Sequence, residues 1–442
     1  MRSHWKLGFL LLVLIMAVVP VIAGCSSSAP ASPTTASEPT KAPAAAPKAT
    51  EPAKPAASPA ASSASEKPAA KAPSGEPYTI GFVNSFSGYM SSMGMPERDA
   101  VLMLADQVNA SGGINGRPLK IIAYDDESNE SKGVLAVKKL IEQDKVIGII
   151  GTAASGVAMA EVPVIEAAKV PFVAMNSSAA ILTPAKKWVF KMPLSEKVYI
   201  GAMYQYMEGK GYKKIALLTQ GAGFGKEALK YFNDTAQSKG FTIVASESYG
   251  PNDTDMTPTL TKIKAANPDI LVVYGAEPAG AIAVRQAKEI GIKAPIIGPD
   301  SLTMASILSV KELRDGLNGF LVADHKTDVW QQLPDTDRQK KAIAALDAAL
   351  QKKYNHGVSN WEGIANDVFW TMIDALKKAN PDTSNLDAAR AKLRDAIEST
   401  KDFVGASNIV SYTAEQHEVP TTESVVISQI EDGKFKLVQT IK

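Results

Sequence analysis

The stretch Thr79-Ile80-Gly81-Phe82-Val83 is a short apolar run, and a longer segment with the amphipathic pattern of a helix follows it. The same alternation of short aliphatic runs and amphipathic segments continues along the chain. A strand that is apolar on both sides must be covered on both sides, and intervening helices supply that cover. The sequence therefore predicts an α/β protein built on parallel sheets.

Two successive series of strands and helices are expected. The first has strands at 79–83, 119–124, 146–150 and 172–174, with helices at about 96–110, 132–143 and 156–168. The second has strands at 215–218, 242–245, 270–274, 295–297 and 320–322, with helices at 200–210, 226–239, 258–266 and 279–290. Later helices at about 337–354 and 363–380 and a strand at 424–430 complete one or both sheets, and periodicity does not say which. We expect two lobes of similar architecture.

The composition limits the function. Acidic and basic residues nearly balance, with a formal net charge of +1, so nothing favours a nucleic acid as partner. One cysteine and four histidines leave no disulfide framework and no cysteine- or histidine-rich metal site. The sequence has no Gly-x-Ser-x-Gly or His-Glu-x-x-His motif, and it reveals no acid and nucleophile partner for His417. We expect no metal, no cofactor and no enzymatic activity.

The N-terminus has the features of an export signal. A basic start and the apolar stretch 7–19 precede the small residues Ala23 and Gly24 and then Cys25, the only cysteine. This arrangement resembles the lipobox of bacterial lipoproteins, whose mature chain begins at a lipid-modified cysteine. The alternative is an uncleaved transmembrane anchor, but the apolar stretch is short for a span and Pro20 interrupts it. We expect an extracytoplasmic protein anchored to the cell membrane through lipid on Cys25.

A segment of low complexity follows the cysteine. From 26 to about 76 the chain consists of Ala, Pro, Ser and Thr with scattered Lys and Glu, and it has no aromatic or large aliphatic residue. Such a segment cannot bury enough apolar surface to offset the loss of conformational entropy, so we expect disorder or polyproline II structure. Its mean reach of about 40 Å would suit a spacer above a bilayer.

The loops after the predicted strands suggest a binding site. In open parallel sheets, ligands bind beyond the carboxyl ends of the strands. The loops there are small and rich in hydroxyl groups and glycine: 84–88, 151–155, 176–178, 220–221, 275–277 and 299–301. They precede helices, so hydroxyl groups and backbone N–H groups could together hold a carboxylate. Each loop alone is also an ordinary helix cap, but Ser155 with Ser177 and Ser178 is a more persuasive combination.

Two motifs could suggest other ligands. The stretch 221–226, Gly-Ala-Gly-Phe-Gly-Lys, resembles a phosphate-binding loop, but its glycine spacing fits neither the dinucleotide nor the Walker A pattern. We expect a tight glycine turn there, with Phe224 facing the space between the lobes. The acidic run 125–130 resembles a calcium loop, but Glu130 stands where an EF-hand needs its turn glycine. A solvated loop is the expected structure of that run.

From about Tyr78 to Ile430 the chain resembles the type I periplasmic solute-binding proteins of the branched-chain amino acid (leucine/isoleucine/valine) class, here in lipoprotein form. These proteins are the receptors of ATP-driven (ABC) importers. The resemblance rests on the following motifs: Ile80-Gly81-Phe82 with Ser87-Gly88, the run Val108-Asn109-Ala110-Ser111-Gly112-Gly113-Ile114-Asn115-Gly116-Arg117-Pro118-Leu119, Tyr124-Asp125-Asp126, Ile149-Ile150-Gly151, Val170-Pro171-Phe172, Gly223-Phe224-Gly225, Asn267-Pro268-Asp269, Arg285-Gln286-Ala287 and Gly298-Pro299-Asp300.

The resemblance implies a fold of two lobes, each a parallel-sheet α/β sandwich, joined by three hinge crossings. It implies that Ser155 holds a ligand carboxylate, with Asn176, Ser177 and Ser178 beside it, and that Asp300 meets an ammonium group. It further implies flanking residues at Phe224 and at Ala276 or Glu277, and ligand side-chain contacts at Tyr89 or Met93. The chain departs from the family pattern because it lacks an aromatic residue near Ala276 and has a carboxylate at Glu277.

We therefore expect a lipid-tethered receptor that delivers a small carboxylate-bearing solute, such as an aliphatic amino acid, to an ABC permease. The alternatives are a receptor for an aromatic or other organic acid or an amide, a sensory ectodomain with a signalling partner, and an extracytoplasmic enzyme. The expected segments are a signal peptide at 1–24, the lipidated cysteine and linker at 25–76, an N-terminal lobe at 77–195 and 324–404, and a C-terminal lobe at 196–323 and 405–442.

Overall fold

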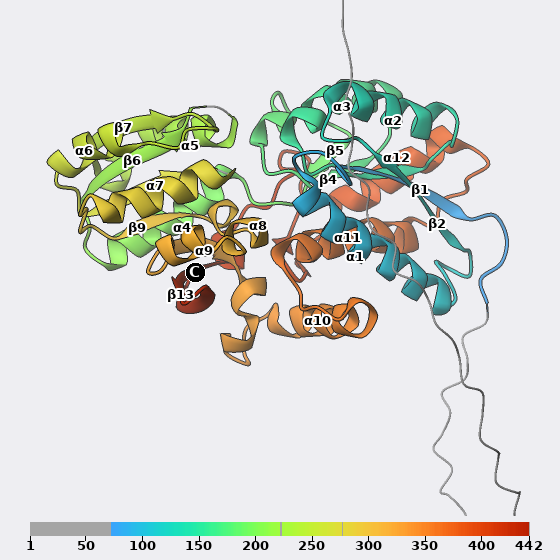
Figure 1. The fold of residues 1–442 in the computed structure, drawn as a ribbon. Helices are drawn as coiled ribbons and strands as arrows, with labels where there is room; N and C mark the ends of the chain where they lie inside the picture. Colours follow the sequence, from blue (N-terminus) through green and yellow to red (C-terminus); the bar gives the residue numbers. More distant parts are fainter. Residues whose placement is uncertain (1–71, 222, 276, 442) are drawn as a thin grey trace, which may run out of the picture. The chain divides into compact units, whose positions relative to one another are not determined.

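The computed structural model describes residues 72–441 except residues 222 and 276. The expected signal peptide, Cys25 and nearly all of the linker lie outside the described residues, as does Ala276. The described chain is an α/β structure with two large sheets, each covered by its own helices (Figure 1). The predicted fold class is therefore confirmed.

The first sheet has five strands in the order β2-β1-β3-β4-β5, and all of its pairings are parallel. Its strands are β1 (Tyr78–Asn84), β2 (Leu119–Asp125), β3 (Gly148–Gly151), β4 (Phe172–Ala174) and β5 (Val189–Lys191). In the centre of the sheet, Ile80 lies opposite Ile121 of β2 and Gly148 of β3. The sequence analysis missed β5 because a strand of three residues is too short to show a periodic pattern.

Helices cover both faces of the first sheet. One face is covered by α2 (Glu130–Glu142) and α3 (Ser155–Ala168), from which Val137 and Ile165 pack into the core. The other face carries α1 (Ser91–Ala110), α11 (Asn360–Ala379) and α12 (Leu386–Glu398), and α10 (Lys340–Tyr354) packs against α1 and α11. The sequence analysis missed α12, whose few large apolar residues lie among alanine and charged side chains.

The start of α1 differs from the prediction. The sequence placed Pro96 near the first turn, whereas the helix begins five residues earlier, at Ser91. A β-carbon on Gly94 would lie 2.0 Å from the carbonyl oxygen of Ser85. Glycine therefore lets the added turn pack directly on the loop that follows β1, which the helical periodicity alone could not reveal.

The second sheet has seven strands in the order β14-β13-β10-β9-β8-β6-β7. Its parallel part is formed by β6 (Lys214–Gln220), β7 (Thr242–Tyr249), β8 (Ile270–Tyr274), β9 (Ile296–Pro299) and β10 (Leu321–His325). An antiparallel hairpin of β13 (Val425–Glu431) and β14 (Lys434–Thr440) extends it beyond β10. Asp432 and Gly433 have the positive φ angles that suit a tight hairpin turn. The predicted strand at 424–430 thus belongs to the second sheet and is antiparallel.

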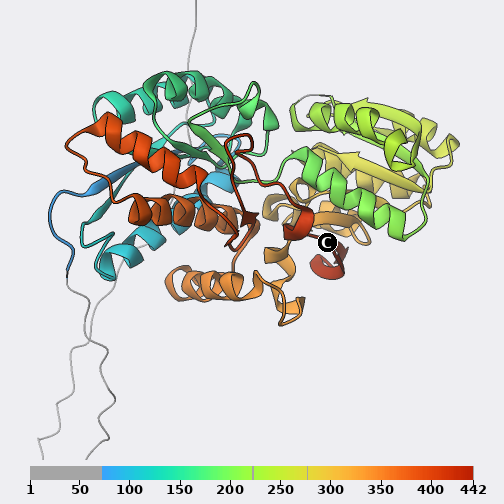
Figure 2. The ribbon, with the colours of Figure 1, turned by 180° about the vertical axis from the view of Figure 1, so that it is seen from behind.

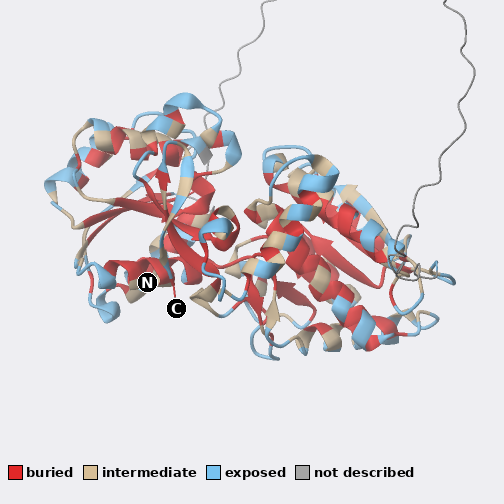
Figure 3. Ribbon diagram, turned by 90° about the horizontal axis from the view of Figure 1, so that it is seen from below, coloured by how far each residue is buried: buried red, intermediate tan, exposed pale blue. Residues whose placement is uncertain are grey.

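The helices of the second sheet are α4 (Glu196–Gly209), α5 (Gly223–Thr235), α6 (Thr257–Ala265), α7 (Glu277–Glu289), α8 (Ala305–Leu308) and α9 (Lys311–Gly316). In both lobes the buried residues lie on the strands and on the inward sides of the helices, while exposed residues lie outside (Figure 3). Across the described part of the chain, no helix is both long and apolar enough to cross a membrane.

The chain passes between the two sheets three times. The first crossing (residues 192–195) links β5 to α4, the second (residues 326–339) links β10 to α10, and the third (residues 399–424) links α12 to β13. The third crossing contains the short pair β11 (Phe403–Val404) and β12 (Ile409–Val410), and it can be followed in red from behind (Figure 2).

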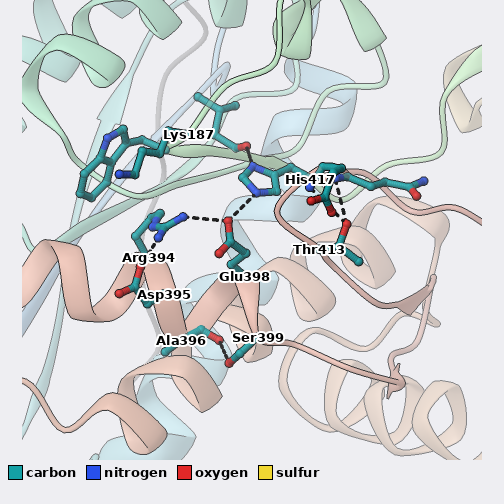
Figure 4. Close-up of polar contacts among 12 residues, drawn as sticks. Lys187, Arg394, Asp395, Ala396, Glu398, Ser399, Thr413 and His417 are labelled. Carbon is teal, nitrogen blue, oxygen red and sulfur yellow. Dashed lines mark hydrogen bonds and ion pairs between the residues drawn. The ribbon is translucent and has the colours of Figure 1, made fainter.

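His417, in the third crossing, packs against and hydrogen-bonds to residues of the first lobe (Figure 4). Its ring stacks on Phe190 with centroids 4.1 Å apart. The ring nitrogen Nδ1 lies 2.9 Å from the carbonyl oxygen of Val189, and Nε2 lies 3.1 Å from Oε1 of Glu398. Arg394 donates to the same Glu398 oxygen at 2.7 Å. The acid partner that the sequence did not reveal therefore exists, and these contacts give His417 a structural role.

Candidate functional site

A cavity of about 110 Å³ lies where the carboxyl ends of strands from both sheets meet. Both lobes contribute to its wall, which consists of Met90, Met93, Ala153, Ser155, Met175, Ser177, Tyr199, Phe224, Asp300, Ser301, Asn360, Trp361 and Ile364. The described residues contain no group of three or more His, Cys, Asp or Glu side chains arranged to hold a metal ion. Hydroxyl, carboxyl and apolar groups are therefore the chemistry that this cavity offers to a ligand.

The loop after β3 supplies the hydroxyl side of the cavity. Gly151 has φ +128°, and a β-carbon there would lie 1.7 Å from the carbonyl oxygen of Val83. Only glycine can make this turn, which sends the chain directly into α3. Ser155 is the first residue of α3, and Ala154 at the N-cap provides no side-chain cap. The first amides of the helix are thus left without a side-chain cap beside the Ser155 hydroxyl group, as a bound carboxylate requires.

A buried amide holds this loop in place. Asn84 at the end of β1 accepts from the backbone amides of Ser85 at 2.9 Å and Ala153 at 2.8 Å. Its Nδ2 donates to Glu97 at 2.6 Å and lies 3.9 Å from the sulfur of Met175, a residue of the cavity wall. Burial raises the pKa of Glu97 well above its usual value, although the hydrogen bond from Asn84 opposes the shift. Asn84 therefore positions two parts of the wall at once.

The acidic run that follows β2 also serves the loops. Asp126 is buried and accepts from the hydroxyl groups of Ser85, at 2.6 Å, and Thr152. Asp125 accepts from the backbone amides of Phe86 and Ser87. These carboxylates therefore act as loop caps beneath the site, which agrees with the expectation of a strand-end loop but shows that Asp126 is not solvated.

Aromatic and aliphatic side chains form the apolar part of the wall. Phe224, near the start of α5, packs against Tyr274 with centroids 4.8 Å apart and against Tyr199 at 6.4 Å, edge to face. Met93 and Met175 add sulfur, and from α11 Trp361 adds aromatic surface and Ile364 aliphatic surface. Such a wall favours an apolar ligand group, and methionine can adapt to its shape.

Asp300 is the acidic group of the cavity. It follows β9 and is 9% exposed. Its Oδ2 accepts from the Tyr199 hydroxyl group at 3.2 Å and from the Asn360 side chain at 2.8 Å. Burial, and secondly the nearby Asp328 carboxylate, raise the pKa of Asp300 to about 7, against the hydrogen bond from Tyr199.

The nearest basic group does not neutralise Asp300. Nε2 of His325 lies 3.8 Å from Oδ2 of Asp300. Burial lowers the pKa of His325 to about 4, so the imidazole is neutral at physiological pH. Among the residues that the structure describes, no lysine or arginine forms an ion pair with Asp300. A cationic ligand group would therefore find an uncompensated acid here.

The predicted ligand contacts are only partly brought together. Five of the ten line the cavity: Met93, Ser155, Ser177, Phe224 and Asp300. Asn176 is buried next to the wall, and its side-chain nitrogen and oxygen have no hydrogen-bond partner. Ser178 instead caps a short 3-10 turn (η1, Ala179–Leu182), and Tyr89 is 70% exposed. Ala276 and the side chain of Glu277 lie outside the description.

Sequence reasoning missed Met90 and Met175, and it missed the contributions of α4 and α11 to the wall: Tyr199, Asn360, Trp361 and Ile364. A signal for the last group was present, because Ser359 and Glu362 form a capping box that marks the start of α11. Local capping chemistry locates a helix start but not the strand ends that it faces, so this signal could not place Asn360 in the site.

The comparisons agree with this architecture. The profile of a family described as periplasmic binding protein matches residues 77–434. Leu/Ile/Val-binding protein homolog 7 of Brucella suis is 25% identical over 388 residues, which cover 83% of this chain and 92% of the relative. Leu/Ile/Val-binding protein BraC3 of Rhizobium johnstonii is 25% identical over 272 residues, covering 60% of this chain and 72% of the relative.

Solved structures show the same fold. An extracellular ligand-binding receptor from Rhodopseudomonas palustris HaA2 aligns with a TM-score of 0.73 and 22% identity, covering 82% of this chain and 100% of that one. The branched-chain amino acid transporter substrate binding protein LivJ from Streptococcus pneumoniae, solved in complex with isoleucine, aligns with a TM-score of 0.69 and 24% identity, covering 83% and 100%. At these identities the likeness concerns the fold alone.

Proposed function

Because the chain belongs to the periplasmic binding protein family, we propose that it binds a small aliphatic amino acid outside the cytoplasm and delivers it to an ABC importer. The observation that carries the proposal is a single cavity with hydroxyl groups from one lobe, an acidic group from the other and apolar side chains around them. These three kinds of group match the carboxylate, the ammonium group and the side chain of an aliphatic amino acid.

Each ligand group has a proposed partner. The carboxylate would meet the hydroxyl groups of Ser155 and Ser177 and the first amides of α3, where the helix dipole favours negative charge. The ammonium group would meet Asp300, and its charge would hold that carboxyl group ionised. The apolar side chain would lie against Phe224 and Met93.

The position of the cavity between the lobes supports the transport role. A ligand that contacts both lobes binds the closed arrangement better than the open one and therefore shifts the population towards closure. The closed, loaded receptor would be the form that a permease recognises. We further propose that lipid on Cys25 anchors the protein and that the Ala/Pro-rich segment spaces it from the bilayer.

The direct test is calorimetric titration of the protein with leucine, isoleucine and valine, and with analogues that lack either the amino or the carboxyl group. We expect saturable binding of at least one complete amino acid and a large loss when the carboxyl group is absent. If none of the three amino acids bound but an aromatic acid or an amide did, the proposed ligand class would be wrong and the receptor role would stand.

A further inference from the structure

Asp300 belongs to a closed ring of five hydrogen-bonded side chains. Each member contacts the next: Asp300 with Asn360 at 2.8 Å, Asn360 with Ser407 at 3.3 Å, Ser407 with His325 at 2.9 Å, His325 with Tyr199 at 2.8 Å, and Tyr199 with Asp300 at 3.2 Å. All five residues are buried, and Ser407 and His325 are completely inaccessible to solvent. From outside the ring, Asn408 Nδ2 also donates to the Ser407 hydroxyl group, at 3.2 Å. Buried polar groups need such partners, because water cannot supply them.

The ring connects the ligand cavity to every crossing between the lobes. Tyr199 lies in the first turn of α4, directly after the first crossing, and His325 ends β10, where the second crossing begins. Ser407 lies in the third crossing, between β11 and β12. Asn360 is the first residue of α11, so the ring also includes the first lobe. Four of its members therefore lie on elements that position Asp300 relative to both lobes.

The donor capacity of each group defines one arrangement of protons for ionised Asp300. The carboxylate can only accept, so it receives the hydroxyl proton of Tyr199 and an amide proton of Asn360. Tyr199 must then accept from His325, which carries its proton on Nε2. Ser407 donates to the bare Nδ1 of His325, and the longest link, from Ser407 to Asn360, is given up.

A second arrangement suits protonated Asp300. The carboxylic acid now donates from Oδ2 to Tyr199, and Tyr199 donates to Nε2 of His325. His325 carries its proton on Nδ1 and donates to Ser407, which donates to Oδ1 of Asn360. Asn360 still donates to Asp300, so each of the five links contains one donor and one acceptor. The ring can thus accommodate either protonation state of Asp300 by reversing its direction through the two tautomers of His325.

The charged surroundings allow this exchange. Five titratable groups interact with Asp300. They are Tyr199 of α4, His325 and Asp324 of β10, Asp328 in the second crossing, and Tyr274 of β8. Burial keeps His325 neutral, so a proton gained by Asp300 changes the His325 tautomer and not its charge. The neighbouring Asp328 carboxylate disfavours a second buried negative charge, which helps the neutral form of Asp300 to compete.

We propose that Tyr199, His325, Ser407 and Asn360 are specificity-determining residues, and that their reversible ring lets Asp300 meet either an ammonium group as a carboxylate or an uncharged ligand group as a carboxylic acid. The inference rests on the proposed function, and it extends the ligand class from aliphatic amino acids to the corresponding carboxylates without the amino group. In the second case the proton stays inside the ring, and no buried charge is left without a partner.

The first experiment needs no ligand. Long-range ¹H–¹⁵N spectra of the protein report the tautomer of each histidine, and a His325→Gln variant identifies the His325 signals. At about pH 8.5, above the pKa of Asp300, we expect a proton on Nε2 of His325, and at about pH 5.5 a proton on Nδ1. One unchanged tautomer at both pH values would overturn the proposal, whatever the protein binds.

The second experiment compares leucine with 4-methylpentanoate, the same molecule without its amino group. We expect both to bind near pH 7, leucine with His325 protonated on Nε2 and 4-methylpentanoate with His325 protonated on Nδ1. When Asp300 is protonated, Ser407→Ala removes two hydrogen bonds from the ring, and when Asp300 is ionised it removes one. It should therefore raise the preference for leucine roughly fivefold, the effect of about one net hydrogen bond.

Ser424→Ala is the matched control, because it removes a buried hydroxyl group that accepts from the Ile409 amide in the same crossing at 3.0 Å. Its ligand preference should match the parent protein. Tyr199→Phe is a second ring variant that keeps the aromatic packing, and it should abolish the pH-dependent change of tautomer. An equal preference in Ser407→Ala and Ser424→Ala would overturn the proposed role of the ring. Failure of both ligands to bind would overturn the amino acid assignment, while the ligand-free spectra would still decide whether the ring reverses.

Discussion

Replacing Asp300 with asparagine tests the proposed ammonium partner with almost no change of shape. Asp300 is nearly buried and forms no ion pair with a lysine or arginine in the described chain, so the ligand would be its main source of positive charge. Hydrogen bonds to charged groups contribute about 1.5–3 kcal/mol, so Asp300→Asn should weaken leucine binding by roughly 10- to 150-fold. The affinity for 4-methylpentanoate should change much less, because that ligand presents no ammonium group.

The same residue predicts how binding depends on pH. The pKa of Asp300 in the free protein is raised to about 7, and a bound ammonium group would lower it, so leucine binding should release a proton below that pH. Its affinity should therefore rise with pH towards a plateau above 7 and fall by up to about tenfold for each pH unit below it.

Titration calorimetry in buffers of different ionisation enthalpy measures both the affinity and the number of protons released. Asp300→Asn should bind leucine weakly and without this pH dependence. Asp234→Asn, which removes an exposed carboxylate from α5, is the control and should behave as the parent protein does. An Asp300→Asn protein that retained parental affinity for leucine at about pH 8 would refute the assignment of Asp300 to the ammonium group.

Three further changes test the site and its support. Ser155→Ala should weaken binding of every carboxylate ligand by about fivefold, the effect of one hydrogen bond, and leave the melting temperature almost unchanged; a loss of stability without a loss of affinity would contradict its role. Glu161→Gln should raise the melting temperature by a few degrees at about pH 8 and by less at about pH 5.5. Burial, and secondly Asp126, hold the pKa of the Glu161 carboxyl group well above its usual value. Neither of its oxygens has a hydrogen-bond partner. Because the pKa of Glu161 is raised on folding, the folded state binds the proton more tightly than the unfolded state. The stability that Glu161 contributes is therefore lost as the pH rises. His417→Ala should lower the unfolding free energy by about 1–3 kcal/mol in denaturant titrations, because it removes the stack on Phe190, a buried contact with Val189 and a partly buried contact with Glu398. An unchanged midpoint would show that the third crossing is held by other contacts.

The chain's local patterns predicted most of its secondary structure. The apolar runs at β1, β3 and β8 are short and buried on both sides, and amphipathic helices separate them, so the α/β class follows from local periodicity. The same patterns place loops of small and hydroxyl residues, including Ser155, at the ends of these strands. The role predicted for Asp300 came from the resemblance to the binding-protein family and not from periodicity.

Short or long-range features could not be predicted in this way. The three-residue strand β5 has no measurable period, and the helix α12 buries few large apolar residues. The partner of β13 is β10, which lies about a hundred positions earlier in the chain, and an isolated strand does not encode that choice. Strand pairing depends on the surface that the rest of the sheet offers, and that surface exists only after folding.

Local patterns in the sequence thus account for most of the strands and helices and for the loops of small and hydroxyl residues at the strand ends. Which polar side chains meet depends on the tertiary structure. Ser407 and His325 are 82 positions apart, and Tyr199 and Asp300 are 101 apart, yet each pair forms a buried hydrogen bond. Periodicity reports only how a residue relates to its near neighbours in the chain, whereas a closed ring of hydrogen bonds requires five distant backbone positions to be fixed together by packing.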